Sequence, residues 1–408
     1  MMAERWLVGI DWATEKHQVC VLDADGELVA EKQVPHSGSG IADLCSWLEE
    51  IAKGQLENVH VAIEVPHGAV VEMLIDRGTM VYAINPKQLD RFRDRFTVAG
   101  AKDDRRDAWV LADSLRTDQR CFKHLEIDSP VLIELREWSR MTEDLQQERI
   151  RLGNRVRQQL RRYYPQMLEL NDDVAADWFL SLWEKAPTPA TAARVQKATV
   201  AAVLKRHRIR RHDAASALKI LRQEPLKVSP GTVAAATAHI GSVADRVRLV
   251  NQQLKQAHRR LDELCDQLLE EEDDSGLTSE QRDISILRSL PGIGRIVLAT
   301  LLAEASQPFT ARDYHALRML TGVAPITKRS GKSCRVEMRH ACNPRLRNAM
   351  YHWARVAVQR DPISRARGHS YARALRSVSD RLLCVACSML RNRTLFAPQH
   401  SLNSRSVA

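Results

Sequence analysis

The chain has 408 residues, a formal net charge of +10 at neutral pH and a pI of about 9.3. This length provides material for two or more domains with a sizeable core, which excludes a role as a simple tail or peptide. A basic excess suits a polyanionic partner, because each Lys or Arg placed on a phosphate releases a counterion. A solvated basic surface would give the same composition.

The eight cysteines are scattered, and only Cys384 and Cys387 form a CxxC pair. A zinc site needs a second pair at matching spacing, so we expect reduced cysteines, with zinc as the lesser alternative. No apolar run approaches the roughly 20 residues of a membrane span, and the N-terminus lacks an apolar signal segment. We therefore expect a cytoplasmic, nucleoid-associated protein with no membrane partner.

Residues 5–120 alternate between the period of strands and the period of helices. Strands are expected at 6–10, 17–23, 28–34, 59–65 and 80–85, and helices at 41–52, 69–78, 86–96 and 103–115. Three strands followed by alternating helices and strands are typical of an α/β domain with an antiparallel hairpin and a parallel part. This order is compatible with a ribonuclease-H-like sheet.

Beyond about residue 130 the strand signals disappear. Between residues 240 and 268 the apolar positions are spaced by three and four residues, which is the a/d pattern of a coiled coil. These positions are Ile240, Val243, Val247, Val250, Leu254, Ala257, Leu261, Leu264 and Leu268. The helix at 134–164 is a candidate antiparallel partner within the chain or across a dimer, and an ordinary helical bundle is the alternative. Residues 170–235 are Ala-rich with Pro breaks and indicate short helices of no evident function.

The pattern divides the chain into four segments. We expect a RuvC-like α/β catalytic domain at 1–125, a helical and coiled-coil region with the Ala-rich insert at 126–283, a helical C-terminal domain at 284–395 and a disordered polar tail at 396–408. The C-terminal domain opens with two amphipathic helices around LPGIG. Gly292 and Gly294 there would offer backbone N–H groups to a phosphate in a helix-hairpin-helix, and a tight turn without a ligand is the alternative.

Four carboxylates of the first domain stand where a metal site on such a sheet would need them. Asp11 ends the first strand, and Glu64 ends the strand that precedes Pro66. Asp104 and Asp107 lie three apart at the start of a helix and hence on one face. Such a cluster could hold Mg²⁺ (or Mn²⁺) against a scissile phosphate. Each carboxylate alone has a structural alternative, as a helix cap or a solvated strand end.

The stretches VGIDWATEKHQVCVLD, AIEVPHG, INPKQL and AKDDRRDAWVLAD resemble the N-terminal, RuvC-like domain of insertion-sequence family one hundred and ten, the DEDD-type transposases. LPGIG, LTGVAPITKRSGKSCRVEMRH and NPRLRNAMYHWA follow in the same family's order. The resemblance places the DEDD quartet on Asp11, Glu64, Asp104 and Asp107. Where family members commonly have Lys-Thr-Asp, this chain has an extra carboxylate at Asp103. The spacing to Asp107 assigns Asp104 to the motif.

Ser330 precedes a glycine in the stretch APITKRSGKSCR. The cations around it, which are candidate nucleic-acid contacts, are Lys328, Arg329, Lys332 and Arg335. A serine in a basic loop is more often a phosphate contact or a turn residue. The resemblance implies instead that Ser330 is the catalytic nucleophile that holds a DNA strand as a covalent phosphoserine, with Ser333 as the fallback.

The resemblance also implies what the protein acts on. Family members are transposases that recombine an insertion sequence with target double-stranded DNA, and a non-coding RNA from the element's flank guides them. They work as homo-oligomers, dimers or tetramers, in which domains of different protomers form composite sites. We therefore expect a magnesium-assisted serine recombinase with a guide RNA and a coiled-coil interface. The stretch at 361–377 is shorter than the corresponding family stretch, which is compatible with an altered C-terminal domain.

Three rival interpretations stay open. A RuvC-like nuclease of the junction-resolvase type would cut with metal-activated water and use Ser330 only as a phosphate contact. A non-catalytic nucleic-acid-binding protein would tolerate alanine at Asp11 or Asp104. An actin-like ATPase is more remote, because its phosphate loop would need a glycine at Ala13.

Overall fold

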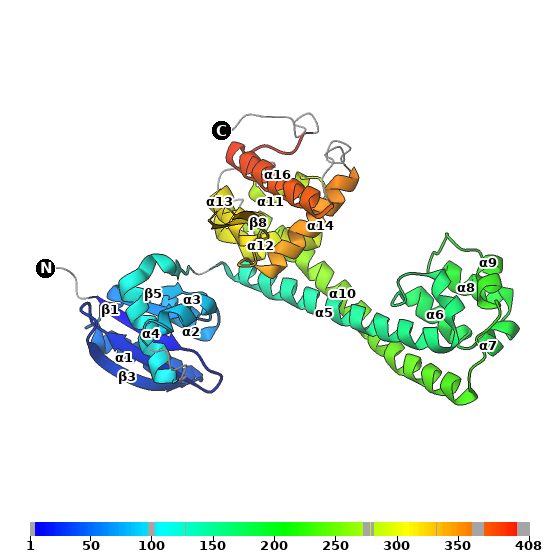
Figure 1. Ribbon diagram of the computed structural model, residues 1–408, viewed down its shortest axis with the longest axis horizontal. Helices are drawn as coiled ribbons and strands as arrows, with labels where there is room; N and C mark the ends of the chain where they lie inside the picture. The colour runs from blue at the N-terminus through cyan, green and yellow to red at the C-terminus, as the bar shows by residue number, and fades with distance from the viewer. Residues whose placement is uncertain are drawn as a thin grey trace. The chain divides into compact units, whose positions relative to one another are not determined.

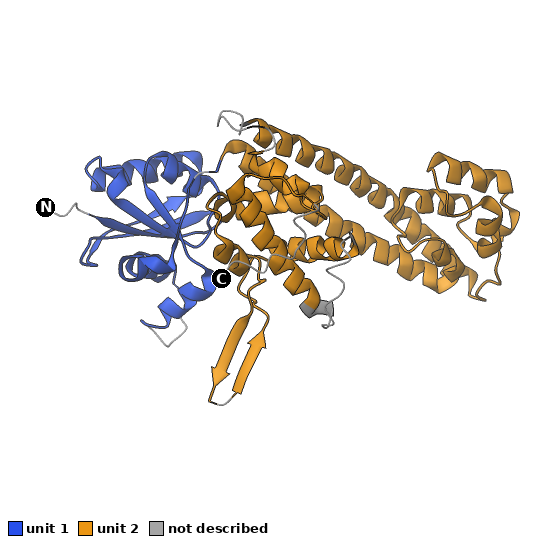
Figure 2. Ribbon diagram, turned by 90° about the horizontal axis from the view of Figure 1, so that it is seen from above, with its two compact units in different colours: residues 1–128 blue, residues 129–408 orange. Residues whose placement is uncertain are grey.

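The computed structural model describes residues 5–96, 103–126, 128–271, 278, 281–331, 333–360 and 371–397. The chain forms two compact units, residues 1–128 and 129–408 (Figure 2). Unit 1 has one hydrophobic core on each face of a sheet. Unit 2 has two cores, which share the two long helices described below. None of the helices in the described ranges is long and apolar enough to cross a membrane.

Unit 1 is built on a six-stranded sheet in the order β3-β2-β1-β4-β5-β6 (Figure 1). The strands are β1 (Trp6–Asp11), β2 (Lys16–Leu22), β3 (Leu28–Pro35), β4 (Val59–Ile63), β5 (Met80–Ala83) and β6 (Lys123–His124). β1, β4 and β5 run parallel, whereas β2, β3 and β6 pair antiparallel with their neighbours. The expected mixed sheet is confirmed. The two-residue strand β6 was not predicted, because two exposed residues carry no periodicity.

Helices cover both faces of this sheet. They are α1 (Gly38–Ile51), α2 (Ala69–Asp76), α3 (Pro86–Arg93) and α4 (Asp104–Asp118), with the 3₁₀ turns η1 (Leu56–Asn58) and η2 (Gln119–Cys121). Side chains alternate along a strand, so Val8 and Ile10 pack with α1 and α2, whereas Leu7 packs with α3 and α4. The face that carries α3 and α4 is therefore also the face of Gly9 and Asp11.

Gly9 allows helix α4 to lie directly on β1. A Cβ at this position would lie 1.9 Å from the carbonyl oxygen of Ala108 and 2.7 Å from the backbone nitrogen of Ala112. Only glycine permits so close an approach of two backbones. The far end of α4 lies by the turn between β2 and β3, where Arg116 contacts Gly26. The first turn of α4 therefore lies toward the end of the sheet where β1 and β4 finish.

Unit 2 is organised around two long helices, α5 (Pro130–Tyr163) and α10 (Pro230–Glu271), which pack along each other (Figure 1). They run antiparallel, because Glu134 pairs with Arg260 at 2.8 Å and Glu148 with Arg246 at 3.2 Å. Of the predicted heptad positions, those from 240 to 254 belong to one core and those at 261 and 264 to the other. The seam is thus shared with further helices, and a separate two-stranded coiled coil stays a prediction.

Two groups of further elements occupy the ends of this helix pair (Figure 1). Between α5 and α10, residues 165–229 form what we call the insert lobe, with η3 (Pro165–Leu170), α6 (Asp177–Lys185), α7 (Pro189–Arg194), α8 (Lys197–Arg206) and α9 (Ala214–Leu221). The other end carries α11 (Asp283–Ser289), α12 (Arg295–Thr310), α13 (Tyr314–Leu320), β7 (Ile326–Ser330), β8 (Ser333–Glu337), α14 (Pro344–Arg360) and α16 (Tyr371–Asn392).

The expectation that strands end near residue 130 is wrong. β7 and β8 form an antiparallel hairpin that projects from the body of unit 2 (Figure 2). Gly331 has a φ of 54° in the turn, a conformation that glycine adopts at little cost. The hairpin is largely exposed on both faces, so its sequence lacks the alternation of buried and exposed residues that predicts a strand.

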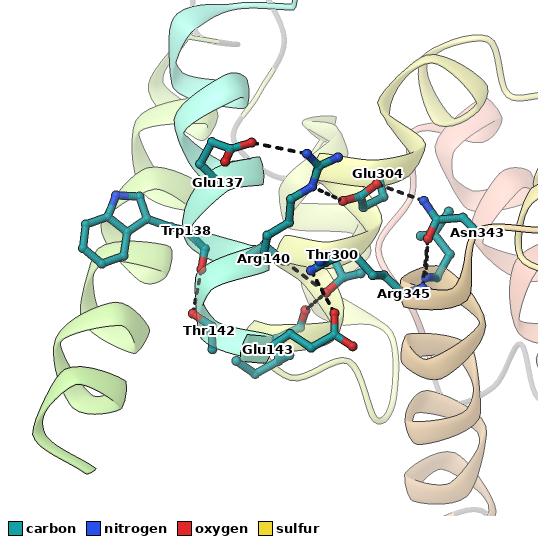
Figure 3. Close-up of polar contacts among 12 residues, drawn as sticks. Glu137, Trp138, Arg140, Thr142, Glu143, Thr300, Glu304, Asn343 and Arg345 are labelled. Atoms are coloured by element: carbon teal, nitrogen blue, oxygen red, sulfur yellow. Dashed lines mark hydrogen bonds and ion pairs between the residues drawn. The ribbon is translucent and has the colours of Figure 1, made fainter. Parts of the chain in front are cut away.

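A polar network joins α5 to α12 and α14 (Figure 3). Arg140 Nε donates to Glu304 at 3.0 Å, and the Asn343 amide donates to the other oxygen of the same carboxylate at 2.9 Å. Asn343 also accepts from the backbone nitrogen of Arg345 at 2.9 Å, so one side chain caps α14 and bridges to α12. The network holds together α5, α12 and α14 in the body of unit 2, from which the β7–β8 hairpin projects (Figure 2).

Candidate catalytic site

Asp11 and Glu64 lie side by side at the carboxyl ends of β1 and β4, two neighbouring central strands of the sheet; we call this end of the sheet the carboxylate edge. Ile10 on β1 is the register partner of Ile63 on β4, and the two carboxylate residues follow directly on these parallel strands. Neighbouring strands are about 4.8 Å apart, so the two residues start from adjacent backbone positions. Both residues are half-buried. Register alone therefore brings two of the four predicted carboxylates together.

Helix α4 carries the other two carboxylates in its first turn. Asp103 is the N-cap, and its side chain accepts a hydrogen bond from the backbone nitrogen of Arg105 at 3.2 Å. The extra carboxylate thus serves to cap the helix. Asp104, the next residue, is exposed, whereas Asp107 is only 1% exposed.

Arg93 at the end of α3 holds Asp107. Its Nε lies 2.7 Å from one carboxylate oxygen, and its Nη2 donates to the other at 2.9 Å. The guanidinium therefore forms one hydrogen bond and one further close ion contact with the buried carboxylate. The sequence reading missed Arg93. The run of three arginines in PKQLDRFRDRF was visible, but no local pattern tells which of them reaches a residue 14 positions away.

The donor set suits a hard divalent cation, because all four predicted ligands are carboxylates. The positions of Asp11 and Glu64 fit such a site, since parallel strands present them at one edge. Across the ranges that the structure describes, no three His, Cys, Asp or Glu side chains are grouped closely enough to hold a metal ion. The fit therefore rests on donor chemistry and register, and Asp107 is engaged by Arg93 as described.

A histidine pair fixes the loop that follows Asp11. His17 is fully buried; its Nδ1 accepts from the backbone nitrogen of Ala13 at 3.2 Å, and its Nε2 lies 2.9 Å from Nδ1 of His36. Burial, and next the neighbouring His36, lower the pKa of His17. The exposed Trp12 ring lies 6.1 Å from the His17 ring. Sequence reading missed this pair, because His17 lies on β2 and His36 follows β3, 19 positions further along the chain.

Ser330 lies at the tip of the β7–β8 hairpin. Its register partner is Ser333, and Lys328 pairs with Arg335 two positions further down. Residues directly opposite each other share a face, so both serines and both cations lie on one face of the hairpin, while Arg329 lies on the other. Among the residues that the structure describes, no side chain hydrogen-bonds the Ser330 hydroxyl.

The charge around Ser330 is only partly compensated. Lys328 Nζ lies 2.7 Å from Glu337, whereas Arg329 and Arg335 are exposed and form no ion pair with a carboxylate among the described residues. The fourth predicted cation, Lys332, lies outside the described residues. Two cations next to a surface serine can offset negative charge on a phosphate.

The LPGIG turn joins α11 to α12. Gly292 has a φ of 85°, and a Cβ there would lie 3.1 Å from the backbone nitrogen of Ala357 on α14. This glycine thus serves a tight turn that packs on α14. Gly294 is exposed and begins α12, so its surroundings leave room for a ligand. Nearby, Arg295 pairs with Asp262 at 3.0 Å, which brings an acidic group close to the same helix start. A helix-hairpin-helix role stays a prediction.

The fold and the edge carboxylates define a class. A mixed sheet with an antiparallel start, a parallel part and acidic residues at the ends of β1, β4 and the start of α4 is consistent with a RuvC-like domain of the DEDD type. Residues 8–165 match the transposase family of this DEDD type typified by IS110. Residues 284–369 match the transposase IS116/IS110/IS902 family.

Full-length relatives support the same assignment. The mini-circle IS117 protein of Streptomyces coelicolor is 33% identical over 415 residues, which cover 96% of this chain and 95% of that protein. The insertion element IS116 protein of Streptomyces clavuligerus is 27% identical, with 97% of each chain covered. The y4uE protein of Sinorhizobium fredii is 58% identical over 208 residues, which span 50% of this chain and 58% of that protein. The chain belongs to the IS110 family of transposases.

Proposed function

We propose that this protein is a DNA transposase that cuts and rejoins DNA through a covalent bond to Ser330. The proposal assigns the carboxylate edge of unit 1, Asp11, Glu64, Asp104 and Asp107, to the same reaction. One observation carries it: the family's two sets of motif residues occur in one chain, on a sheet edge and on an exposed basic hairpin. We also retain the four-segment division of the chain as a working scheme.

The proposed step exchanges one phosphate ester for another. The Ser330 oxygen gives up its proton and forms a bond to the DNA phosphorus, while the bond from phosphorus to one sugar oxygen breaks and that oxygen takes up a proton. In rejoining, a sugar hydroxyl of the new strand attacks the phosphoserine, and the serine is restored. The number of phosphate esters does not change, so the reaction needs no ATP.

The residues of each site have distinct roles in this scheme. Arg335, on the face of Ser330, and Arg329 offset charge on the phosphate, which stabilises the negative charge that develops there as the serine attacks. Asp11, Glu64, Asp104 and Asp107 would hold a divalent cation, Mg²⁺ or Mn²⁺. When bound, such a cation supplies positive charge against the phosphate oxygens. Arg93 holds Asp107 in place, and the histidine pair holds the loop after Asp11.

The partners in this proposal are double-stranded element ends and target DNA, a guide RNA encoded by the element, and further copies of the chain. The basic composition and the exposed hairpin support a nucleic-acid partner. The guide RNA and the oligomer rest on the family resemblance. Sequencing of RNA that co-purifies with the protein, and its mass in solution, would test both.

The test is a search for a covalent protein–DNA adduct. The gene would be expressed with its native flanking DNA, the cells denatured in SDS, and the adduct measured for wild type and variants. Ser330→Ala and Asp104→Asn should both abolish it. The matched controls are Ser333→Ala, which changes the opposite serine, and Asp103→Asn, which keeps a good N-cap. DNA cleavage without an adduct, unchanged in Ser330→Ala, would instead favour a metal-dependent RuvC-like nuclease.

A further inference from the structure

Basic residues are concentrated in the second part of the insert lobe, from residue 187 onward, whereas the whole lobe has eleven Lys and Arg against seven Asp and Glu, a net charge of +4. Residues 187–228 contain ten Lys and Arg but only two Asp and Glu, which gives this stretch +8 of the chain's +10. The adjoining end of α5, residues 149–162, adds six arginines and no acid. Concentrated charge repels itself and weakens a compact fold, so it calls for a partner of opposite charge.

Four cations at the end of α8 and in the loop after it lack acidic partners. Lys205, Arg206, Arg208 and Arg210 are exposed, and none pairs with a carboxylate within the described parts of the chain. Many other arginines of unit 2 form ion pairs with carboxylates. Arg248 lies 2.6 Å from Glu184, and other such pairs join Arg140 to Glu304, Arg288 to Asp266 and Arg312 to Asp283.

The loop that presents these cations is tied to the lobe by its other residues. His207 Nε2 lies 3.1 Å from the Ser181 hydroxyl, and His212 Nε2 lies 2.9 Å from the carbonyl oxygen of Leu170. Arg211 donates to the same carbonyl at 3.2 Å and lies over the Trp178 ring at 5.4 Å. The inward contacts alternate with the outward Arg208 and Arg210. A pre-ordered array of cations loses less entropy when it binds.

Arg208 occupies a position that would suit glycine. Its φ is 55°, in the left-handed region, directly after α8 ends. Helices commonly end on a glycine at this position because glycine has no Cβ to strain. Among the residues that the structure describes, none forms a hydrogen bond or ion pair with the Arg208 side chain, so folding alone does not account for an arginine there.

The lobe lacks exposed aromatic rings. The aromatic residues between 149 and 228 are Tyr163, Tyr164, Trp178, Phe179 and Trp183, and all are buried. Proteins that bind single strands stack the bases on exposed rings, whereas proteins that bind the duplex backbone need only cations. The surface is therefore suited to duplex phosphates and not to unstacked bases.

We propose that Lys205, Arg206, Arg208 and Arg210 form a docking surface for the phosphate backbone of duplex DNA, read without regard to sequence. The choice of DNA rests on the proposed function, since a transposase acts on DNA duplexes. This gives the insert lobe a role in holding DNA that is separate from the carboxylate edge and from the Ser330 hairpin.

The test measures binding of the full-length protein to duplex DNA of arbitrary sequence by fluorescence anisotropy at several salt concentrations. Arg208→Gly combined with Arg210→Gln should weaken binding on the order of tenfold. It should also flatten the plot of log K against log salt by about 1.8, or about 0.9 for each lost phosphate contact. Arg208→Gly alone should leave the melting temperature unchanged or higher, because glycine adopts the left-handed backbone conformation without the strain that a Cβ causes. A binding loss with an intact fold is the result expected.

The matched control is Arg77→Gln combined with Arg120→Gln, which removes two exposed cations of unit 1 that form no ion pair with the residues described there. Equal effects in the two double variants would overturn the proposal, because they would show a general charge effect. Weakened binding to an RNA hairpin stem with unchanged binding to DNA would overturn it as well. Ser330→Ala should bind duplex DNA like wild type. The lobe's binding and the Ser330 chemistry can therefore fail independently.

Discussion

The carboxylate edge of unit 1 and the serine hairpin of unit 2 carry their candidate groups in opposite ways. Asp11 and Glu64 project from adjacent strands in the middle of a six-stranded sheet, and Asp107 is buried and held by Arg93. Ser330 stands at the exposed tip of a two-stranded arm, and no described side chain hydrogen-bonds its hydroxyl. A group on a packed scaffold is positioned by the core, whereas a group on an arm is positioned by its substrate.

This contrast predicts which substitutions will act through stability and which will act through chemistry alone. Changes beneath the carboxylate edge should unfold unit 1 and remove activity together. Changes on the hairpin should remove activity while the melting temperature stays nearly constant. The variants below are ordered from the largest expected effect to the smallest.

Gly9→Ala should have the largest effect on stability. Its Cβ would lie 1.9 Å from the Ala108 carbonyl oxygen, so α4 must move off β1 and carry Asp104 and Asp107 with it. Overpacking of this kind costs about 3 kcal/mol or more. The loss of stability is measured by thermal unfolding of the protein. Gly38→Ala, with open space around its Cβ, is the control, and equal melting temperatures for the two variants would refute the close packing.

Glu304→Ala should destabilise unit 2 by about 3 kcal/mol, because it leaves Arg140 and Asn343 without their shared acceptor. Burial alone would raise the pKa of Glu304, but the hydrogen bond and charge of Arg140 hold it below the ordinary value. The stabilisation is thus present above the ordinary carboxyl pKa of about 4.3 and is lost as the pH falls through the folded value. Denaturant titrations across this range should show a flatter pH dependence in Glu304→Gln than in wild type.

Arg93→Gln should destabilise unit 1 by about 2 kcal/mol, since the buried Asp107 loses its cation. Added Mg²⁺ or Mn²⁺ should then raise the melting temperature of the variant more than that of wild type, because a divalent cation can replace the lost charge. Differential scanning calorimetry with and without the cation provides the comparison. An identical metal response in both proteins would separate Asp107 from any metal site.

Gly331→Ala tests the hairpin. Its φ of 54° strains an alanine by about 1 kcal/mol, and the strain falls on an exposed turn that supports no core. We expect adduct formation to fall severalfold while the melting temperature changes little. A large drop in melting temperature would mean that the hairpin is part of the structural core and not an arm.

The smallest effect concerns pH and His17. Its pKa is lowered in the folded protein by burial and by His36, so the unfolded chain binds more protons. Stability from this group is therefore full above the ordinary pKa of about 6.5 and declines as the pH falls toward the folded value. Chemical denaturation from neutral to mildly acidic pH should show a slope that His17→Gln lacks. The same slope in both proteins would assign the effect to other groups.

The elements of unit 1 could be read from the sequence because each follows a local period. Runs such as WLVGI and HQVCVLD are buried on at least one face, and the order of strands and helices then placed Asp11 and Glu64 at strand ends. The alternation of the chain also predicted the start of α4, where Asp103 and the helical run mark the cap.

The remaining features depend on contacts that no local pattern encodes. The β7–β8 hairpin is charged along its length, so the burial that creates a strand period is absent. Arg93 and Asp107, like His17 and His36, meet only after the sheet has formed. The close packing of the Gly292 turn on α14 likewise depends on contact between segments that are distant in the sequence. Such pairs can be found from a sequence only after the fold is known.

The most direct measurement is the identity of the residue that carries DNA. The adduct would be purified, trimmed with nuclease and digested with trypsin, which cuts after Arg329, Lys332 and Arg335 and so separates Ser330 from Ser333. Mass spectrometry should find the nucleotide phosphate on the peptide of residues 330–332. A modification on residues 333–335, or no modified peptide from a reaction that has cut DNA, would contradict the role assigned to Ser330.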